Sequence, residues 1–332
     1  MQGPTEERQQ EGVAVSEHQE INDVTPTSLS HIIGQRSVVE QVKVAVEAAF
    51  ADSRKFDHAL LVGPPGVGKT AMAQVIASEM AVVFTEALGQ SIKNPGDLNA
   101  LLLAAKDRSV LHLDEAHELK KEYQTALYRA NEGRKLFIQG RSSVQSIPLA
   151  DFSLLLSTTD EYCLLQPLRD RMKLVLRFQF YAEDELTVLL RQRSRALNWS
   201  VDESVFPQVA QRARGVPRLA LRLLQSARRV CRAEGDRTIT LAHLERACGL
   251  EQLDALGLGP TEQHYLRILA EGDSRLNVIA SRLGLPPRTV SQVSEPFLLR
   301  AGFLVKDDQG RRQLTALGRE HLVNSEQQRR NP

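Results

Sequence analysis

Residues 63–70 read Gly63-Pro-Pro-Gly-Val-Gly-Lys-Thr70, and the architecture of the chain follows from them. An apolar segment at 58–63 leads into these residues and a helical pattern at 69–80 follows, so a glycine loop joins a predicted strand to a predicted helix. In such a loop, backbone N–H groups bind phosphate, a lysine reaches the β- and γ-phosphates, and a hydroxyl ligates Mg²⁺. The segment therefore predicts a phosphate-binding loop. A chance glycine turn is the alternative, which the flanking strand and helix disfavour.

Strand and helix patterns alternate on both sides of this loop. A helical period covers 36–50, and short apolar runs occupy 82–86, 109–113 and 153–158. This alternation predicts an α/β domain with a parallel sheet flanked by helices. Because ligands collect at the carboxyl ends of parallel strands, polar residues that follow these runs are candidates for a site.

Downstream of Tyr181 the strand patterns end, and helical periods predict a small all-α domain over 183–197, 202–213, 217–233 and 240–248. Three further helical segments from about 254 precede a hairpin pattern at 302–315, which is typical of a winged helix-turn-helix. The expected boundaries are a disordered tail at 1–23, a large domain at 24–181, a helical lid at 182–252, a winged helix at 253–323 and a tail at 324–332.

Composition narrows the class of protein. The chain has 332 residues, of which 42% are hydrophobic, so it can bury several cores. Lys and Arg number 42 against 41 Asp and Glu, so any nucleic-acid site has to be local. No apolar run approaches the ~20 residues that cross a bilayer, and the N-terminus lacks the pattern of a signal peptide. We expect a cytoplasmic protein without membrane contact, and three separated cysteines predict neither disulfides nor a zinc site.

Adjacent carboxylates end the predicted strand in Ser109-Val-Leu-His-Leu-Asp-Glu-Ala-His117. Asp114 is expected to hold Mg²⁺ through water. Glu115 is expected to polarise the attacking water, because phosphoryl transfer needs an oriented nucleophile. By itself, an Asp-Glu pair after a strand is more often a solvated strand end. Its presence in the same chain as a phosphate loop favours the catalytic interpretation instead. His112 and His117 lack partners at metal spacing, so we expect packing or local hydrogen bonds from them.

Three later segments carry further polar candidates. The strand at 152–158 leads into Thr159, a candidate γ-phosphate sensor whose alternative role is a strand-end cap. In Pro167-Leu-Arg-Asp-Arg-Met172, either arginine could act across a subunit interface or form a surface salt bridge. Arg218 opens a helix after a Gly-Val-Pro turn and is a candidate lid contact. The ten arginines between 191 and 232 are interpreted mostly as solvated helix faces.

Taken in order, these motifs resemble AAA+ ATPases, and among them the RuvB family. The resemblance runs from about 28 to 322 and includes Ile33-Gly-Gln35, Asn94-Pro-Gly-Asp97, Leu253-Asp-Ala-Leu-Gly257 and Glu295-Pro-Phe-Leu-Leu-Arg-Ala-Gly-Phe-Leu304. It implies an AAA+ P-loop ATPase domain, a small all-α lid and a C-terminal winged helix that touches DNA. It also implies a hexameric ring that uses ATP and Mg²⁺ to branch-migrate Holliday junctions in recombination and repair, with a RuvA-type protein and a RuvC-type resolvase as partners.

The resemblance also implies roles at matching positions. Glu115 and Thr159, the first sensor, are implied catalytic residues, together with Arg171 as an arginine finger that acts on a neighbouring subunit. Thr70 and Asp114 are the implied Mg²⁺ ligands, Ile33 and Tyr181 line the adenine site, and Arg218 is the second sensor. The full implied nucleotide-binding set is Ile33, Gly66, Val67, Gly68, Lys69, Thr70, Ala71, Asp114, Tyr181 and Arg218.

The chain departs from the family pattern in three places. Thr25-Pro26 stands where the family has Arg-Pro, and the hairpin at about 136–149, which docks RuvA in the family, is shorter and lacks a basic residue. The wing reads Lys306-Asp-Asp-Gln-Gly-Arg311 in place of a basic run. Asp307 and Asp308 are negatively charged like the DNA backbone, so they oppose the counterion release that drives binding to phosphates. Lys306 and Arg311 remain as the expected DNA contacts.

These departures leave two classes of function open. The first is the ATP-driven junction motor. The second is a RuvB-derived ATPase that acts as a nucleotide-gated assembly or regulatory switch, with a wing that binds protein or nothing. A clamp-loader-like AAA+ protein is a third hypothesis, disfavoured by the winged-helix resemblance. Salt titration of DNA binding separates the first two, because a motor that grips phosphates weakens steeply with salt.

Overall fold

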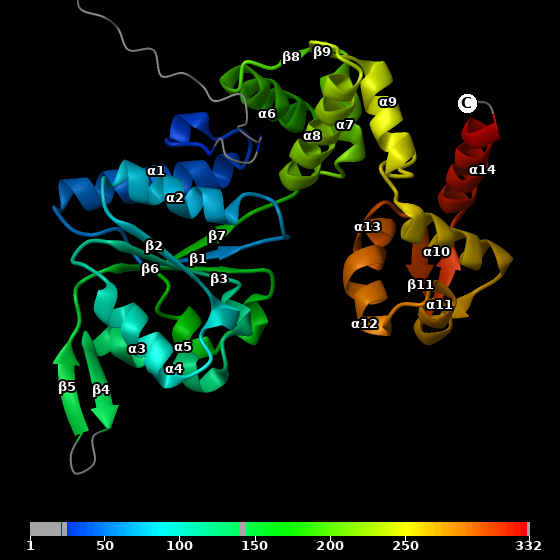
Figure 1. Ribbon diagram of the computed structural model, residues 1–332. Helices are drawn as coiled ribbons and strands as arrows, with labels where there is room; N and C mark the ends of the chain where they lie inside the picture. Colours follow the sequence, from blue (N-terminus) through cyan, green and yellow to red (C-terminus); the bar gives the residue numbers. More distant parts are fainter. Residues whose placement is uncertain (1–20, 22–24, 140–143, 331–332) are drawn as a thin grey trace, which may run out of the picture.

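The computed structural model describes residues 21, 25–139 and 144–330, and its first domain is built on a five-stranded sheet (Figure 1). The strand order is β2-β3-β6-β1-β7, and each neighbouring pair is parallel, as predicted. The edge strand β7 was not predicted, because its four residues are too few to give a clear pattern. The strands are β1 (Ala59–Val62), β2 (Phe84–Leu88), β3 (Val110–Asp114), β6 (Ser153–Thr158) and β7 (Leu174–Arg177).

Helices cover both faces of this sheet (Figure 1). Helices α1 (Arg36–Ala51) and α2 (Lys69–Glu79) lie on one face; α3 (Pro95–Ala104), α4 (Lys121–Gly133) and α5 (Gln166–Arg169) lie on the other. Successive strand residues point to opposite faces, so Leu61 packs in the core under α1 and α2 while Leu60 packs in the core with α3 and α4. Short 3-10 turns occupy Leu29–His31, Gly89–Ser91, Ala116–Glu118 and Glu161–Cys163.

The lid is mainly helical, with α6 (Glu183–Ala196), α7 (Val205–Arg212), α8 (Pro217–Ala233) and α9 (Leu241–Leu250). The expectation that strands end after Tyr181 was wrong, because β8 (Ser200–Val201) pairs in parallel with β9 (Thr238–Ile239). Two-residue strands are too short to produce a periodic pattern.

Ile21 corrects the prediction of a disordered tail at 1–23. Its side chain is fully buried and belongs to the hydrophobic core of the lid, because an apolar residue gains stability by leaving water. The other residues of that predicted tail lie outside the described part of the chain.

The C-terminal domain is a winged helix. Its helices are α10 (Pro260–Glu271), α11 (Leu276–Leu283), α12 (Pro287–Thr289) and α13 (Glu295–Arg300), and a π-helical turn at Val290–Ser294 joins α12 to α13. Its strands β10 (Ser274–Arg275), β12 (Arg311–Leu314) and β11 (Leu304–Lys306) pair in that order. Helix α14 (Ala316–Arg330) corrects the predicted tail at 324–332, because the helix that anchors Leu322 in the core continues to Arg330; residues 331–332 lie outside the described chain.

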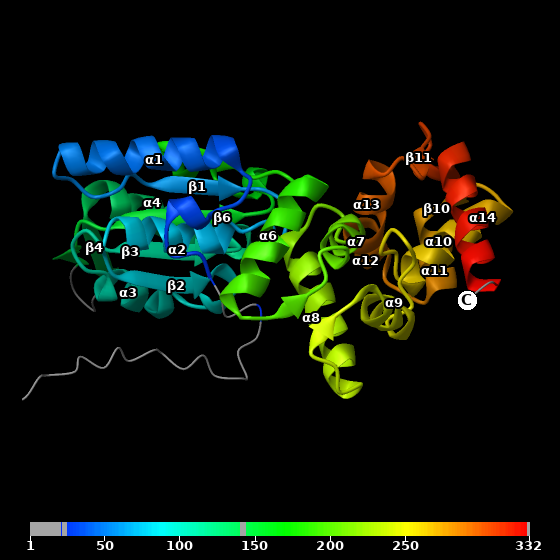
Figure 2. The same ribbon diagram turned by 90° about the horizontal axis from the view of Figure 1, so that it is seen from above.

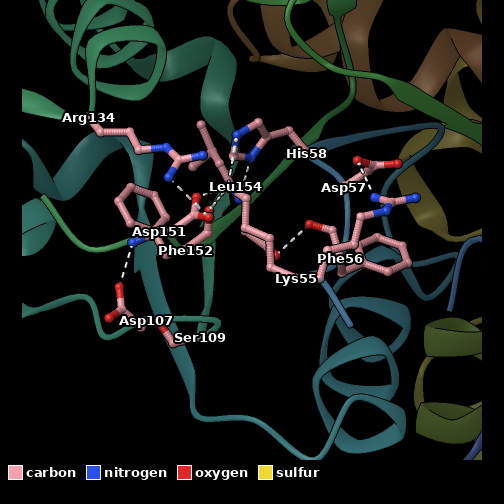
Figure 3. Close-up of polar contacts among 12 residues, drawn as sticks. Lys55, Phe56, Asp57, His58, Asp107, Ser109, Arg134, Asp151, Phe152 and Leu154 are labelled. Atoms are coloured by element: carbon pink, nitrogen blue, oxygen red, sulfur yellow. Dashed lines mark hydrogen bonds and ion pairs between the residues drawn. The ribbon is translucent and has the colours of Figure 1, made fainter. Parts of the chain in front are cut away.

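A β-hairpin extends from the edge of the large domain opposite the phosphate loop, with β4 (Lys135–Gln139) antiparallel to β5 (Val144–Pro148). Asp151 fixes its base, because its carboxylate pairs with Lys55 Nζ at 3.0 Å and with Arg134 Nη1 at 3.4 Å (Figure 3). Next to this pair, Nδ1 of His58 accepts a 2.9 Å hydrogen bond from the Leu154 N–H. Burial lowers the pKa of His58 to about 4 and also lowers the pKa of Lys55.

Candidate nucleotide site

The phosphate loop lies between β1 and α2, at the sheet edge where the strands end. Gly66 and Gly68 both have left-handed backbones, with φ of +77° and +100°. A Cβ on Gly66 would lie only 2.9 Å from Cγ1 of Val216 in the lid. Glycine at this position therefore allows both the turn and the close approach of the lid to the loop.

Lys69, the predicted phosphate-binding lysine, is buried inside the phosphate loop. Its Nζ donates hydrogen bonds to the carbonyl oxygens of Gly63 at 2.8 Å and Pro64 at 2.9 Å. Burial lowers the pKa of Lys69, while the nearby Glu115 and Asp114 carboxylates oppose that shift. The ammonium group thus lies at the loop with its donors directed at backbone oxygens.

Thr70 and Asp114 come together as the sequence predicted. The Thr70 hydroxyl donates a 3.1 Å hydrogen bond to Oδ2 of Asp114, which joins the first turn of α2 to the end of β3. A hydroxyl and a carboxylate oxygen are the hard oxygen donors that Mg²⁺ prefers. These two side chains therefore fit a Mg²⁺ site.

Glu115 follows β3 in a left-handed conformation, with φ of +49°. Its N–H donates a 3.0 Å hydrogen bond to Oδ1 of Asp114, and its Oε2 lies 3.3 Å from Nδ1 of His117. The same His117 nitrogen lies 3.1 Å from Oγ1 of Thr158 at the end of β6. His117 thus forms the local contacts expected of it, but its position between two strand ends could not be read from the sequence.

A cavity of about 440 Å³ lies over this edge of the sheet, between the large domain and the lid. This volume lies within the range of small-molecule binding sites. Val67 is buried and does not line the cavity. The lining includes these predicted site residues: Ile33, Gly66, Gly68, Lys69, Thr70, Ala71, Asp114, Glu115, Tyr181 and Arg218.

The lid contacts the phosphate loop directly. The Arg218 N–H, in the first turn of α8, is 3.4 Å from the carbonyl oxygen of Gly66, and the Tyr181 N–H donates to the carbonyl oxygen of Gly215 at 2.9 Å. Burial raises the pKa of Tyr181 to about 12, so its phenol stays neutral near pH 7. Arg218 and Tyr181 are therefore held at the boundary between the two domains.

Two predicted catalytic residues lie outside this cavity. Thr159 is exposed just beyond β6, whereas the preceding Thr158 is buried. Arg171 binds Glu132 at 2.6 Å and the carbonyl oxygen of Pro167 at 2.6 Å, and its guanidinium lies 4.8 Å from the ring centroid of Tyr128. Arg171 is therefore on the surface of the large domain and away from this chain's own nucleotide cavity.

Sequence reasoning missed several lining residues. Gln35 forms two hydrogen bonds with the backbone of Gln179, at 2.7 and 3.1 Å, and so ties the N-terminal segment to the hinge before the lid. Its membership in the Ile-Gly-Gln motif was the available signal. The lid supplies further missed positions, which no motif marks: Leu189, Gln192, Arg193 and Leu221. The large domain supplies others, among them His31, Ile32, Gln74 and Phe178.

The two predicted DNA contacts differ in their surroundings. Nζ of Lys306 lies 2.9 Å from Oε2 of Glu295, a fully buried carboxylate that also accepts from Arg312 Nε at 2.6 Å and the Tyr265 hydroxyl at 2.6 Å. Burial alone would raise the pKa of Glu295, but these donors outweigh it and hold the pKa below its usual range. The side chain of Arg311 is exposed.

Family models match three consecutive parts of the chain. They are the Holliday junction DNA helicase RuvB P-loop domain at 24–178, the RuvB AAA lid domain at 181–254 and the RuvB C-terminal winged helix domain at 255–323. The chain belongs to the RuvB family. This result confirms the predicted family and its succession of P-loop ATPase domain, lid and winged helix. As a member of this P-loop ATPase family, the chain is a nucleotide-binding protein.

Individual RuvB proteins are similar to this chain along most of their length. The Holliday junction branch migration complex subunit RuvB of Kosmotoga olearia is 37% identical over 305 residues, which cover 90% of this chain and 89% of that protein. The subunit named RuvB 2 of Synechococcus sp. is 38% identical over 89% of this chain and 82% of its own length. The solved structure of the Thermotoga maritima RuvB Holliday junction branch migration motor is 31% identical, with a TM-score of 0.78 over 90% of this chain and 98% of that one.

Among the described helices, none combines the length and the apolar character that a membrane span requires.

Proposed function

We propose that this chain is an ATP-driven motor that branch-migrates Holliday junctions in DNA recombination and repair. One observation carries the proposal: the phosphate loop, the Asp114–Glu115 pair and Arg218 of the lid line a single cavity in a RuvB-family chain. Its substrate is four-way junction DNA, its cofactors are ATP and Mg²⁺, and it acts in the cytoplasm. The shared name of the relatives supports the motor over a nucleotide-gated switch.

Each cavity residue has a role in ATP hydrolysis under this proposal. Lys69 and the loop N–H groups bind the phosphates, and Thr70 with Asp114 would hold Mg²⁺, which neutralises phosphate charge when bound. Glu115 accepts a proton from the attacking water. His117 packs against this carboxylate, with Nδ1 at 3.3 Å from Oε2, and its proposed role is to restrict the carboxylate's orientation. Ile33 and Tyr181 contact the adenine, and Arg218 contacts the phosphates from the lid. Thr159, which lies outside the cavity, is proposed to sense the γ-phosphate from the end of β6.

Subunits of a ring complete one another's sites in this proposal. Arg171 lies outside its own cavity, on the surface of the large domain, which supports a role toward a neighbouring subunit; there it would exchange its pairing with Glu132 for the neighbour's nucleotide. A guanidinium from the neighbour neutralises charge in the transition state, which makes hydrolysis depend on assembly. A closed ring of six copies is the proposed assembly.

Other proteins contact this motor at separate places. A RuvA-type junction-binding protein is proposed to dock on the hairpin β4–β5, where Phe137 is 60% exposed. Exposed aromatic side chains are typical anchors of protein interfaces. A RuvC-type resolvase is a further proposed partner on the same junction.

Conversion of a synthetic mobile four-way junction into duplex products tests the proposal. The assay contains ATP, Mg²⁺ and the full chain, with and without a RuvA-type protein, and uses Lys69→Ala as the blank. Conversion that requires both ATP and Lys69 is the expected result. Robust ATP hydrolysis without conversion under either condition would overturn the motor and favour the switch.

A further inference from the structure

Five side chains join the large domain, the lid and the winged helix: Phe180, Arg214, Glu262, Phe297 and Arg300. We call them the three-domain contact. The Arg300 guanidinium, at the end of α13, lies 3.4 Å from the ring centroid of Phe180 at the hinge between the large domain and the lid. Its Nη2 also donates to the carbonyl oxygen of Arg214 in the lid. In Figure 2, α13 lies on the side of the winged helix that faces the lid.

Arg214 makes the reciprocal contact from the lid to the winged helix. Its Nη1 donates to Oε1 of Glu262 at 3.0 Å, and its guanidinium lies 4.7 Å from the ring centroid of Phe297. The two charged side chains are only 13% and 17% exposed. An ion pair this far out of water fixes geometry, because either charge is costly to bury without the other.

The same lid segment reaches the nucleotide cavity. Residues 214–218 begin at Arg214, whose φ is +56°, and end at Arg218, whose N–H faces the carbonyl oxygen of Gly66 in the phosphate loop at 3.4 Å. Between them, a Cβ on Gly215 would lie 3.0 Å from Cβ of Phe180, so the segment and the hinge are tightly packed. One end of this short turn holds the winged helix and the other touches the phosphate loop.

We propose that Arg300 and Arg214 are positioning residues that couple the nucleotide state of the cavity to the placement of the winged helix. The inference rests on the proposed function, which makes the cavity an ATP site and the winged helix the DNA-binding domain. A nucleotide that shifts Arg218 or Tyr181 also shifts the adjoining Arg214 or Phe180, to which the winged helix is attached. If nucleotide binding changes the affinity of the winged helix for DNA by some factor, thermodynamic linkage requires that bound DNA change the affinity for nucleotide by the same factor.

Hydrogen exchange of the backbone amides over 295–301 tests this coupling without DNA. We expect binding of a non-hydrolysable ATP analogue to the full-length native chain to change exchange in α13 by about fivefold or more. In Arg300→Ala the change should shrink to about twofold or less. Arg300→Lys should behave like Arg300→Ala, because an ammonium cannot replace the planar guanidinium stacked on Phe180.

The matched control is Arg282→Ala, which removes another winged-helix arginine, paired at 2.8 Å with Glu271 on the surface. It should keep the native response. Equal responses in Arg300→Ala and the native chain would overturn the proposal, as would the absence of any nucleotide effect in the native chain. Unchanged basal ATP hydrolysis in Arg300→Ala, which lies outside the cavity, verifies that the variant is folded.

A second arm measures the affinity for duplex DNA with ADP and with the ATP analogue. The ratio of the two dissociation constants should fall toward one in Arg300→Ala and stay native in Arg282→Ala; a native ratio in Arg300→Ala would overturn the coupling. If the native chain binds no DNA in either state, the proposed motor function fails, while hydrogen exchange still decides whether nucleotide reaches the winged helix.

Discussion

Nδ1 of His117 lies 3.3 Å from Oε2 of Glu115, so an imidazole packs against the carboxylate expected to activate water without forming a hydrogen bond to it. The same nitrogen reaches Thr158 at 3.1 Å, and the three residues join the ends of β3 and β6. The imidazole thus lies between the Glu115 carboxylate and the end of the neighbouring strand. This arrangement leads to separate predictions for the base and for the residue that orients it.

Glu115→Gln should lower kcat for ATP hydrolysis by about 10²- to 10⁴-fold, because the amide cannot accept a proton from water. ATP affinity should remain native, since Lys69, Thr70 and the loop backbone are unchanged. Steady-state hydrolysis and equilibrium binding of a fluorescent ATP analogue measure the two quantities. Native kcat in the variant would contradict the assignment of the base.

His117→Ala should lower kcat by about tenfold to 10²-fold with little change in KM. The Glu115 carboxylate remains but loses the imidazole packed against it, and misorientation of a catalytic group costs rate rather than binding. Comparison with His264→Ala, an exposed histidine in the winged helix, controls for a general effect of losing an imidazole. A loss confined to KM would argue that His117 acts on binding.

Mixtures of Arg171→Ala and Lys69→Ala subunits should regain hydrolysis that each variant lacks alone. A mixed ring places a native Arg171 beside a native Lys69 at some interfaces, so complete sites form between subunits. Hydrolysis measured across mixing ratios should peak near equal proportions. If every mixture stays inactive while each variant still assembles, Arg171 does not act in trans.

We expect Lys306 and Arg311 in the wing to contribute unequally to DNA affinity. Arg311→Ala should reduce the slope of log affinity against log salt by about 0.9, as expected when one phosphate contact is lost. Lys306→Ala should change the slope less, because its ammonium is paired with the buried Glu295 at 2.9 Å. Gln309→Ala on the same turn is the uncharged control. An unchanged slope in Arg311→Ala would remove that residue from the DNA interface.

The pKa of about 4 for His58 predicts how acid weakens the large domain. Above pH ~6.5 the imidazole is neutral in both folded and unfolded states, so it contributes no pH dependence. Between pH ~6.5 and ~4 the unfolded state binds a proton that the folded state excludes, and the free energy of unfolding falls by up to about 1.4 kcal/mol per pH unit.

Hydrogen exchange of the β1 and β6 amides as a function of pH measures this loss. His58→Asn should flatten the profile, because a side-chain amide oxygen can replace Nδ1 as the acceptor for the Leu154 N–H and does not titrate. A slope identical to that of the native chain would assign the acid sensitivity to another group.

The sequence predicted the parts of the site that local spacing determines. The phosphate loop and the Asp114–Glu115 pair each lie within one strand-to-helix or strand-to-turn connection, so their geometry follows from a few consecutive residues. Parallel pairing then places them at the same sheet edge, because β6 pairs with both β1 and β3. Such motifs are visible before any tertiary structure is known.

Contacts between distant segments were not predictable in this way. Lys306 pairs with Glu295 across two elements of the winged helix, and nothing in the wing sequence marks that partner. The lid residues Leu189 and Gln192 reach the cavity only because α6 packs beside it. Thr159 and Arg171 stay predictions, since their proposed roles require a bound nucleotide or a neighbouring subunit.

The hairpin root at Asp151 and the phosphate loop lie at opposite ends of the central strands. Strand β6 separates them by six residues, or about 20 Å at ~3.3 Å per residue. A protein seated on the hairpin therefore leaves the cavity mouth clear. ADP can leave the cavity and ATP can enter it while that protein stays bound to the hairpin. Nucleotide exchange therefore does not require the bound protein to dissociate.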